Sequence, residues 1–488
     1  MTQIERLSQQ IVELRAAALA HEARLGPELE PVHAHFQRGA RNLAHYIAAR
    51  RVDLRPLQRE LATLGLSSLG RMEKCVLPTF DAVAHALRAL VSGAEAQAPP
   101  AIDFDTPEAE LERNASALLG STGEVPSTRI MITLADDADA DAIARLLEAG
   151  AQVARINCAK GDRKSWSKLA DQVRTAERQT SRSCRILCDL PGPNPRTCAL
   201  GAHEDDGAGH VELGDSLFLL RDKAVKKRLS KHERRHVALG VTLPQVLSEV
   251  KPGQRVFYDD SALIGKVVHA SGDQLELEVT FVQKPELKIK YGKTLNFPDT
   301  ELALDSLTQA DLAALDFIVT RADAVGFSFV RSPEDVVRLQ AELRARAATA
   351  LGIVLKIETP RAFRSLPRLL LQAMQSPHVG VMVARGDMAV ELGFVGLAEA
   401  QEEILWLCEA ALVPVIWATQ VLESLNKSGV PSRAEVTDAA MSARAECVML
   451  NRGPQQRRAV EFLREILART GEHHQKKRDL LKKLEMCE

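Results

Sequence analysis

The stretch VMVARGDMAVEL, residues 381–392, decides how the whole sequence is interpreted. Its first four residues form the end of an apolar run, which is typical of a buried parallel strand. Arg385, Gly386 and Asp387 follow where that strand is expected to end. In barrels and doubly wound sheets of parallel strands, ligands bind at the carboxyl ends of the strands. The stretch therefore predicts a functional site at the end of a buried strand.

Seven more apolar runs of strand length lie along the chain, and seven of the eight strands in all are followed directly by a helical pattern. The seven runs are RIMITL (129–134), VARIN (153–157), RILCDL (185–190), AVGFSFV (324–330), GIVLKIE (352–358), VPVIWATQ (413–420) and CVMLN (447–451). Eight strand–helix units predict an α/β fold, the (β/α)8 or TIM barrel, with its function at the carboxyl ends of the strands.

Two regions depart from the strand–helix rhythm. Residues 200–298 show the alternation of β-strands, as in HVELGDSLFLL and DQLELEVTFVQ, and predict a small β-barrel lid domain inserted after the third barrel strand. Residues 1–98 carry apolar residues at helical spacing and predict an N-terminal all-helical region. We expect a linker at 99–128, the barrel at 129–199 and 299–470, and a charged C-terminal helix at 471–488.

Composition limits the class of protein. The 488 residues carry 63 Lys and Arg against 65 Asp and Glu, a net charge of -2, so no basic surface predicts a nucleic-acid partner. No apolar run approaches the ~20 residues that a membrane span needs. The eight cysteines form no CxxC motif, which is typical of reduced thiols in a cytoplasmic protein.

Polar residues follow six of the predicted strands and should meet at one mouth of the barrel. In chain order they are Arg155 and Asn157, Asp189 and Arg196, Ser328 and Arg331, Lys356 and Glu358, Gly386 and Asp387, and Thr419 and Gln420. Lys356 and Glu358 are two apart on one strand, so their side chains share a face. Glu358 and Asp387, from neighbouring strands, form an oxygen-only pair suited to Mg²⁺. The alternative is a structural Lys–Glu ion pair beside a surface Asp.

Several short sequence motifs, taken in order, resemble those of the pyruvate kinase family. They are VARIN-x-x-x-G, CDLPGPNPRT, GKTLNFPD, GFSFVRS, LKIE, MVARGD, WATQVLES and SRAEVTD. The resemblance covers Arg129 to about Leu450, around two-thirds of the chain. The family has a (β/α)8 barrel with a β lid after the third strand, which is the arrangement predicted above. The chain resembles a divergent member with an N-terminal helical extension and without the family's C-terminal effector domain.

The resemblance implies a role for each residue at the mouth. Glu358 and Asp387 would hold Mg²⁺ or Mn²⁺, which bridges oxygens of phosphoenolpyruvate. Lys356 would neutralise charge on the transferring phosphoryl group, and Arg155 would bind the same phosphate. The backbone N–H groups of Gly386 and Asp387, with Thr419, would hold the substrate carboxylate.

Further roles are implied at the rim of the mouth. Ser328 matches a substrate-binding position, and Arg196 matches a contact to a nucleotide phosphate. Asn157 and Asp189 match ligands of a monovalent cation. Lys356, Arg155 and Thr419 are thus the implied catalytic residues.

The potassium site departs from the family pattern. Ala159 stands where the family has a serine ligand, and Leu190 and Pro191 replace a Thr-Lys pair. Two of the four potassium ligands are therefore missing, which puts a potassium requirement in doubt. Lys160 could place an ammonium group near the vacated cation position; the alternative is a solvated lysine.

The residues expected near the nucleotide also differ from the family pattern. The first strand ends in Ala135-Asp136-Asp137-Ala138 instead of Gly-Pro-Ala-Ser, and the eighth is followed by Asn451-Arg452-Gly453-Pro454 instead of Ser-Gly-Glu-Thr. The lid's Asp-Asp-Gly has become Asp259-Asp260-Ser261. Carboxylates near a polyphosphate would repel it unless another cation lies between.

Three functions follow from this pattern. The resemblance implies a cytoplasmic, glycolytic phosphotransferase that converts phosphoenolpyruvate and ADP to pyruvate and ATP with Mg²⁺, as a homo-oligomer. An alternative is a Mg²⁺-dependent enzyme that performs enolate chemistry on phosphoenolpyruvate or pyruvate without a nucleotide. A third is a phosphoenolpyruvate-binding sensor without activity.

Overall fold

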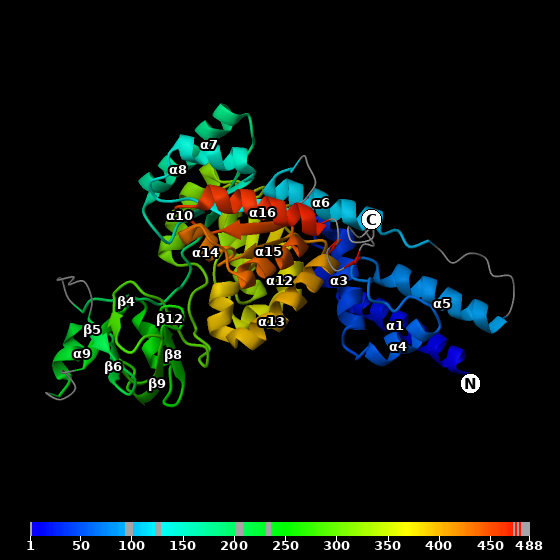
Figure 1. The fold of residues 1–488 in the computed structure, drawn as a ribbon. Helices are drawn as coiled ribbons and strands as arrows, with labels where there is room; N and C mark the ends of the chain where they lie inside the picture. The colour runs from blue at the N-terminus through cyan, green and yellow to red at the C-terminus, as the bar shows by residue number, and fades with distance from the viewer. Residues whose placement is uncertain are drawn as a thin grey trace.

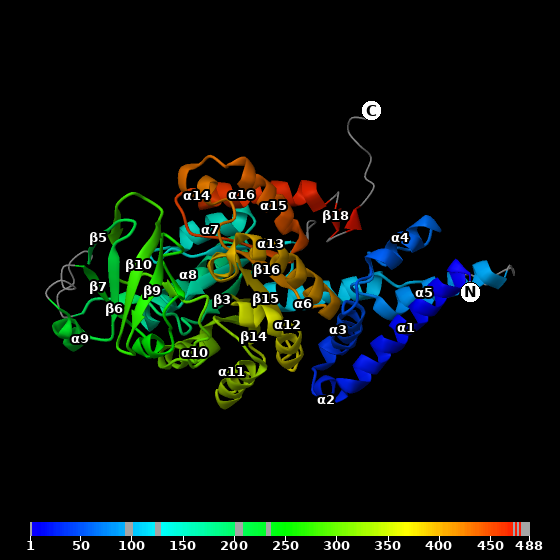
Figure 2. The ribbon, with the colours of Figure 1, turned by 90° about the horizontal axis from the view of Figure 1, so that it is seen from below.

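The computed structural model describes residues 2–92, 101–122, 128–200, 208–230, 236–471, 474–475 and 478–479. Three parts are visible in two perpendicular views (Figures 1 and 2). The barrel lies in the middle, the inserted β domain lies on one side of it, and the N-terminal helices lie on the other side. Among the described helices none is long and apolar enough to cross a membrane.

Eight parallel strands close into the barrel in the order β1-β17-β16-β15-β14-β13-β3-β2. They are β1 (Arg129–Thr133), β2 (Val153–Asn157), β3 (Arg185–Asp189), β13 (Ala324–Phe327), β14 (Gly352–Ile357), β15 (Val379–Ala384), β16 (Val415–Ala418) and β17 (Cys447–Leu450). Strands covered on both faces are expected to be apolar throughout, and β13 to β17 are buried at every position. The predicted barrel is confirmed.

Helices surround the barrel and connect its strands along the chain. They are α7 (Ala140–Ala149), α8 (Arg163–Thr180), α10 (Gln309–Arg321), α11 (Pro333–Ala345), α12 (Pro360–Ala373), α13 (Arg385–Ala411), α14 (Glu423–Ser428), α15 (Arg433–Met441) and α16 (Gln456–Gly471). Helix α13 starts directly at the end of β15 and is kinked at Gly393, which has φ 74°. Its first turn therefore carries Arg385, Gly386 and Asp387 into the barrel mouth.

Residues 99–128, predicted as a linker, contain helix α6 (Asp105–Leu119) instead. Leu118 and Leu119 are buried at the amino end of the barrel, in contact with the strands. A Cβ at Gly352 or Gly380 would lie 2.4 or 2.5 Å from the Leu118 methyl groups, so these glycines make room for that side chain. The linker prediction weighed the Pro- and Ala-containing residues before α6 and missed that α6 closes the bottom of the barrel.

The N-terminal region is helical over its described residues. It comprises α1 (Gln3–Arg24), α2 (Gly26–Leu29), the short 3-10 turn Ala34–Phe36, α3 (Gln37–Ala49), α4 (Arg55–Thr63) and α5 (Val76–Ser92). Helix α3 packs on the end of α13, where the Asn42 amide donates to the carbonyl of Ala410 at 2.9 Å. The same carboxamide accepts the N–H of Val76 at 3.1 Å. Asn42 therefore joins α3, α5 and α13 at one buried point.

The inserted lid is built on a seven-stranded, barrel-like sheet in the order β12-β8-β9-β10-β6-β7-β4, with a two-stranded sheet β11-β5. Its strands are β4 (Thr197–Cys198), β5 (Gly209–Val211), β6 (Ser216–Leu220), β7 (Val237–Val241), β8 (Arg255–Tyr258), β9 (Leu263–Ala270), β10 (Gln274–Val282), β11 (Leu287–Ile289) and β12 (Leu295–Asn296). The described part of the lid also contains helix α9 (Lys223–Arg228) and a 3-10 turn (Pro244–Ser248). At its junction with the barrel, the Asn296 amide donates to Glu391 of α13 at 3.0 Å.

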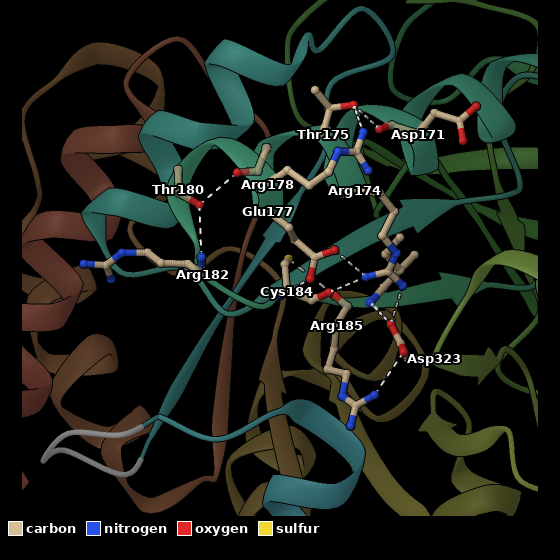
Figure 3. Close-up of polar contacts among 12 residues, drawn as sticks. Asp171, Arg174, Thr175, Glu177, Arg178, Thr180, Arg182, Cys184, Arg185 and Asp323 are labelled. Atoms are coloured by element: carbon tan, nitrogen blue, oxygen red, sulfur yellow. Dashed lines mark hydrogen bonds and ion pairs between the residues drawn. The ribbon is translucent and has the colours of Figure 1, made fainter.

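At the amino end of the barrel, opposite the mouth, Asp323 ties β3 to the start of β13 (Figure 3). Its carboxylate accepts the N–H of Ile186 at 2.8 Å and pairs with Arg174 and Arg185, each at 3.0 Å. Burial raises the pKa of Asp323, but the Ile186 amide and the two arginines outweigh it and hold that pKa below its usual range. Each group of this cluster has a partner, so we assign it a structural role.

The charged helix predicted at 471–488 is not formed at its start. Helix α16 ends at Gly471, and a short antiparallel pair follows between β18 (His474–Gln475) and β19 (Arg478–Asp479). Glycine has poor helix propensity and commonly ends helices, which is why α16 stops here. Residues 472–473, 476–477 and 480–488 of the prediction lie outside the described residues.

Candidate active site

Lys356 lies at the centre of the barrel mouth, near the end of β14. Its ammonium group is 2.9 Å from Glu358 Oε1 and 3.3 Å from Asp189 Oδ2, and it donates to Ser328 Oγ at 2.8 Å. Burial lowers the pKa of Lys356, but the Asp189 and Glu358 carboxylates outweigh it and hold that pKa above its usual range. The result is a permanently charged lysine in a water-poor site.

Arg155, from β2, reaches the same carboxylate. Its guanidinium donates twice to Asp189 Oδ2, at 2.7 and 2.9 Å, and once to Thr133 Oγ1 at 3.2 Å. Burial raises the pKa of Asp189, but Arg155 and Lys356 outweigh it and hold that pKa low. Two cations therefore converge on a single buried carboxylate.

Gly326 on β13 makes this convergence possible. A Cβ at that position would lie 2.1 Å from Asp189 Oδ1 and 3.0 Å from Asp189 Cγ. Strand β13 lies between β3 and β14 in the barrel, so a side chain there would keep the Asp189 carboxylate away from Lys356. The missing side chain lets β3 and β14 share an ion pair across their common neighbour.

Glu358 and Asp387 form the candidate divalent-metal site. Burial and the nearby Glu358 carboxylate raise the pKa of Asp387 to about 7, although Lys356 opposes the shift. Glu358 accepts the N–H of Phe329 at 2.6 Å, which leaves lone pairs on both of its oxygens. Within the described ranges no group of three or more His, Cys, Asp and Glu side chains could hold a metal. Two crowded carboxylates nevertheless fit Mg²⁺, which keeps several waters or substrate oxygens.

The lid brings a third carboxylate towards this site. The Asp260 charge is one of the causes that raise the pKa of Asp387. Burial and the adjacent Asp259 raise the pKa of Asp260 itself. The turn that carries them is unusual, because Asp259, Asp260 and Ser261 all have positive φ, at 49°, 53° and 71°.

Thr419 and Gly386 face each other beside Asp387. The Gly386 N–H donates to Thr419 Oγ1 at 2.7 Å, and Thr419 has φ 68°, a strained value for a β-branched residue. Backbone strain of this kind persists only where the surroundings enforce it. The half-buried N–H and hydroxyl form a small donor site at the mouth.

Arg385 holds this donor site in place. Its guanidinium donates to the carbonyls of Ala418 and Thr419, at 2.9 and 2.6 Å, pairs with Asp438 and stacks on the Trp417 ring at 4.7 Å. Sequence reasoning quoted Arg385 and Asp438 within motifs but gave neither a role. Thr133, the partner of Arg155, was also missed, although a polar residue at the end of β1 was a usable signal.

Asn157 and Asp189, the residues predicted for a monovalent cation, lie opposite each other in the register of β2 and β3. Asn157 Oδ1 accepts the N–H of Ala159 at 3.0 Å, and the buried Asp189 Oδ1 has no hydrogen-bond partner among the described residues. Ala159 and Leu190 supply no side-chain oxygen. Lys160 makes no ion pair with Asp189 among the described residues; the cations at Asp189 are Lys356 and Arg155. Two of the four predicted ligand positions therefore lack a side-chain oxygen.

The predicted nucleotide contact Arg196 lies at the base of the lid. Its guanidinium donates to the carbonyl of Gly292 at 3.0 Å. Its positive charge contributes to the lowered pKa of Lys160 and opposes the raised pKa of Asp260. Closer to the mouth, Asp136 and Arg452, from two loops that depart from the family pattern, form an ion pair at 2.7 Å. The carboxylate that should repel a polyphosphate thus has its own cation.

A closed parallel barrel with charged residues gathered at the carboxyl ends of its strands places this chain in the (β/α)8-barrel class. Residues 125–455 match the family model described as "Pyruvate kinase, barrel domain". The chain belongs to the pyruvate kinase family.

Curated relatives agree with this assignment. A pyruvate kinase of Methylorubrum extorquens is 33% identical over 66% of this chain and 63% of its own length. Those of Corynebacterium glutamicum and Geobacillus stearothermophilus are each 31% identical, over 66% and 64% of this chain and 64% and 50% of their own lengths. The chain therefore spans only about half to two thirds of these relatives.

The missing potassium ligands lead to a first prediction. Replacing K⁺ by tetramethylammonium at constant ionic strength should change the rate of pyruvate formation less than twofold, because Lys356 and Arg155 already neutralise Asp189. The measurement is a steady-state rate at fixed Mg²⁺ and substrate in each salt. Strong activation by K⁺ alone would show that an ion binds at this position despite Ala159 and Leu190.

Proposed function

We propose that the chain transfers a phosphoryl group from phosphoenolpyruvate to a nucleoside diphosphate, with Mg²⁺, as its relatives' name implies. The observation that carries the proposal is the buried Lys356, held between Glu358 and Asp189 beside Arg155. Phosphoryl transfer depends mainly on fixed cations aimed at the phosphate oxygens. A structural ion pair would not need two cations on one carboxylate at the open end of a barrel.

Each part of phosphoenolpyruvate has a complementary group at the mouth. The substrate carboxylate would replace the contact between Gly386 and Thr419, accepting from the Gly386 N–H, which now donates to Thr419 Oγ1, and from the Thr419 hydroxyl. The phosphate would lie against Arg155 and Lys356. Ser328 accepts from the lysine ammonium at 2.8 Å and is buried, so its part is to orient Lys356.

The metal would be held by Glu358 and Asp387. When bound, Mg²⁺ supplies positive charge that stabilises the enolate oxygen left after transfer. The two carboxylates hold it beside the substrate, and the fixed Lys356 charge acts on the transferring group. The lid, joined to α13 through Asn296 and Glu391, would exclude water and so limit hydrolysis.

The acceptor is tested by measuring pyruvate formation from phosphoenolpyruvate and Mg²⁺ with and without ADP. Pyruvate that forms only with ADP, together with an equal amount of ATP, is the expected result. Pyruvate without ADP would make the chain a phosphatase instead. Binding of phosphoenolpyruvate without turnover would favour a sensor. The seven described cysteines are free thiols, so the assay belongs in reducing buffer, as a cytoplasmic setting implies.

A further inference from the structure

Glu391 is a half-buried acid to which the chemistry above gives no role. It lies four residues after Asp387 in the first turns of α13, so the two side chains lie on the same face of that helix. Among the described residues, the Asn296 amide, at 3.0 Å, is the only side-chain partner of Glu391. Burial raises the pKa of Glu391, the hydrogen bond from Asn296 opposes the rise, and the Asp299 charge adds to it. Because a carboxylate removed from water costs free energy unless it is hydrogen-bonded, the contact to Asn296 stabilises Glu391 where it lies.

Asn296 belongs to the lid, and its position is fixed there. It is 6% exposed and lies in β12, opposite Phe257 of β8. The N–H of Leu295, the other residue of β12, donates to the carbonyl of Pro195 at 2.8 Å. Pro195 lies in the connection that enters the lid, and β12 leads into the connection that leaves it. The Asn296 amide therefore projects from the point where the two connections meet.

The same corner of the lid carries the turn that faces the metal site. The N–H of Asp259 donates to the carbonyl of Thr294, just before β12, at 3.1 Å. Asp260 follows in that turn. Burial raises the pKa of Asp387, and the charges of Asp260 and Glu391 add to the rise. The position of β12 against α13 thus sets how close the lid carboxylate lies to Asp387.

The lid does not pack closely on the barrel around this contact. A cavity of about 310 Å³ lies between the two lid connections and the starts of α12 and α13. Across it, Arg361 and Glu301 pair at 2.7 Å, but both side chains are at least half exposed, and such pairs contribute little to stability. Arg331 donates to the carbonyl of Leu302 at 2.9 Å, which holds the connection beyond the end of β12. The contact between Glu391 and β12 therefore bridges a gap in the packing. The cavity is lined by residues 193–195, 295–302, Leu304, Phe329, Arg331, Thr359, Pro360, Arg361, Arg364 and Glu391.

We propose that Glu391 is a positioning residue that holds the lid over the metal site through Asn296. While the contact lasts, Asp260 faces Asp387 and the mouth is covered. When it breaks, the cavity gives β12 room to move away from α13, and water enters. The inference rests on the proposed function and names a residue that keeps phosphoryl transfer from becoming hydrolysis. In hydrolysis, water attacks the phosphorus in place of ADP, which gives pyruvate and inorganic phosphate.

The test compares Glu391→Ala with Glu391→Gln, with pyruvate, ATP and inorganic phosphate measured in the same reaction. In Glu391→Ala the rate of ATP formation should fall about tenfold, as expected for loss of a hydrogen bond to a charged group. Pyruvate should exceed ATP, and the difference should appear as inorganic phosphate. The affinity for phosphoenolpyruvate should change less than about twofold, because Lys356 and Arg155 lie on barrel strands. Glu391→Gln keeps an oxygen that accepts from Asn296, so its pyruvate and ATP should stay equal.

Two further variants show whether Glu391 acts through Asn296. Asn296→Ala should reproduce Glu391→Ala, and the double variant should lose no more than either single variant. Glu301→Ala removes an exposed acid from the wall of the same cavity and should leave pyruvate and ATP equal. Additive losses in the double variant, or equal pyruvate and ATP in Glu391→Ala, would overturn the inference.

Hydrogen exchange measures the contact without turnover. The backbone amides of residues 386–392, measured without substrate or metal, should exchange faster in Glu391→Ala and Asn296→Ala than in the parent and in Glu391→Gln, because the first turns of α13 lose their cover. Equal exchange in all four proteins would reject this inference even where the parent makes ATP. A parent that makes no pyruvate with ADP, while exchange responds as expected, would reject the proposed function and leave the lid contact supported.

Discussion

Lys356→Met should lower the rate of pyruvate formation by about a thousandfold or more. Loss of a single preorganised charge contact costs roughly 10²–10³ in rate, and fixed cations on a transferring phosphoryl group have larger effects, about 10³–10⁵. Lys356 is the only described lysine that contacts both Glu358 and Asp189. No neighbouring lysine can take its place, because Ser328 and the two carboxylates fix the ammonium position.

The variant needs a folding control, since removing one partner of a buried ion pair costs about 3–5 kcal/mol. Thermal unfolding and phosphoenolpyruvate binding should be measured alongside activity. Lys356→Arg keeps the charge but changes its geometry, and Lys168→Met removes an exposed lysine from α8. A folded Lys356→Met protein that turns over within tenfold of the parent would contradict the assigned role.

Gly39→Ala should destabilise the protein by about 1–3 kcal/mol, the usual cost of overpacking. The new Cβ would lie 2.1 Å from the carbonyl oxygen of Ala411 and 2.7 Å from its carbon. These are backbone atoms at the end of α13, so they cannot turn aside as a flexible side chain can. The substitution also gains about 1 kcal/mol of helix propensity. The overpacking must outweigh this gain for the free energy of unfolding to fall.

Gly26→Ala is the matched control for Gly39→Ala. Gly26 lies in the neighbouring helix α2, and nothing lies within 4 Å of the Cβ that the substitution would add. Its denaturation midpoint should match or slightly exceed that of the parent. A midpoint for Gly39→Ala at or above that of Gly26→Ala would show that α3 does not pack against α13 in solution as it does here.

The barrel could be predicted from sequence because its signal is local. Each strand is a short apolar run, and helical periodicity follows it at once. Lys356 and Glu358 could be paired for the same reason, since they are two residues apart at the end of β14. Helix α6 could not be placed, because its burial depends on Gly352 and Gly380, which are more than two hundred residues away.

The rest of the site depends on contacts between distant strands. The pairing of Lys356 with Asp189 crosses β13 and needs the missing side chain of Gly326. Likewise, Asp136 and Arg452 looked like two separate losses in the sequence, but barrel closure through β1 and β17 brings them together. Residues at positive φ, such as Thr419, carry no periodic signal at all.

The contact between Gly39 and Ala411 has a consequence for synthesis of the chain. The two residues are 372 positions apart (411 − 39), which at about 5–20 residues per second takes the ribosome roughly 20 to 70 s. During that time the N-terminal helices are complete while their partner surface does not yet exist. The side of α3 that packs on α13, which includes Gly39 and Asn42, stays uncovered until α13 emerges, so a nascent chain exposes a surface that the finished protein hides.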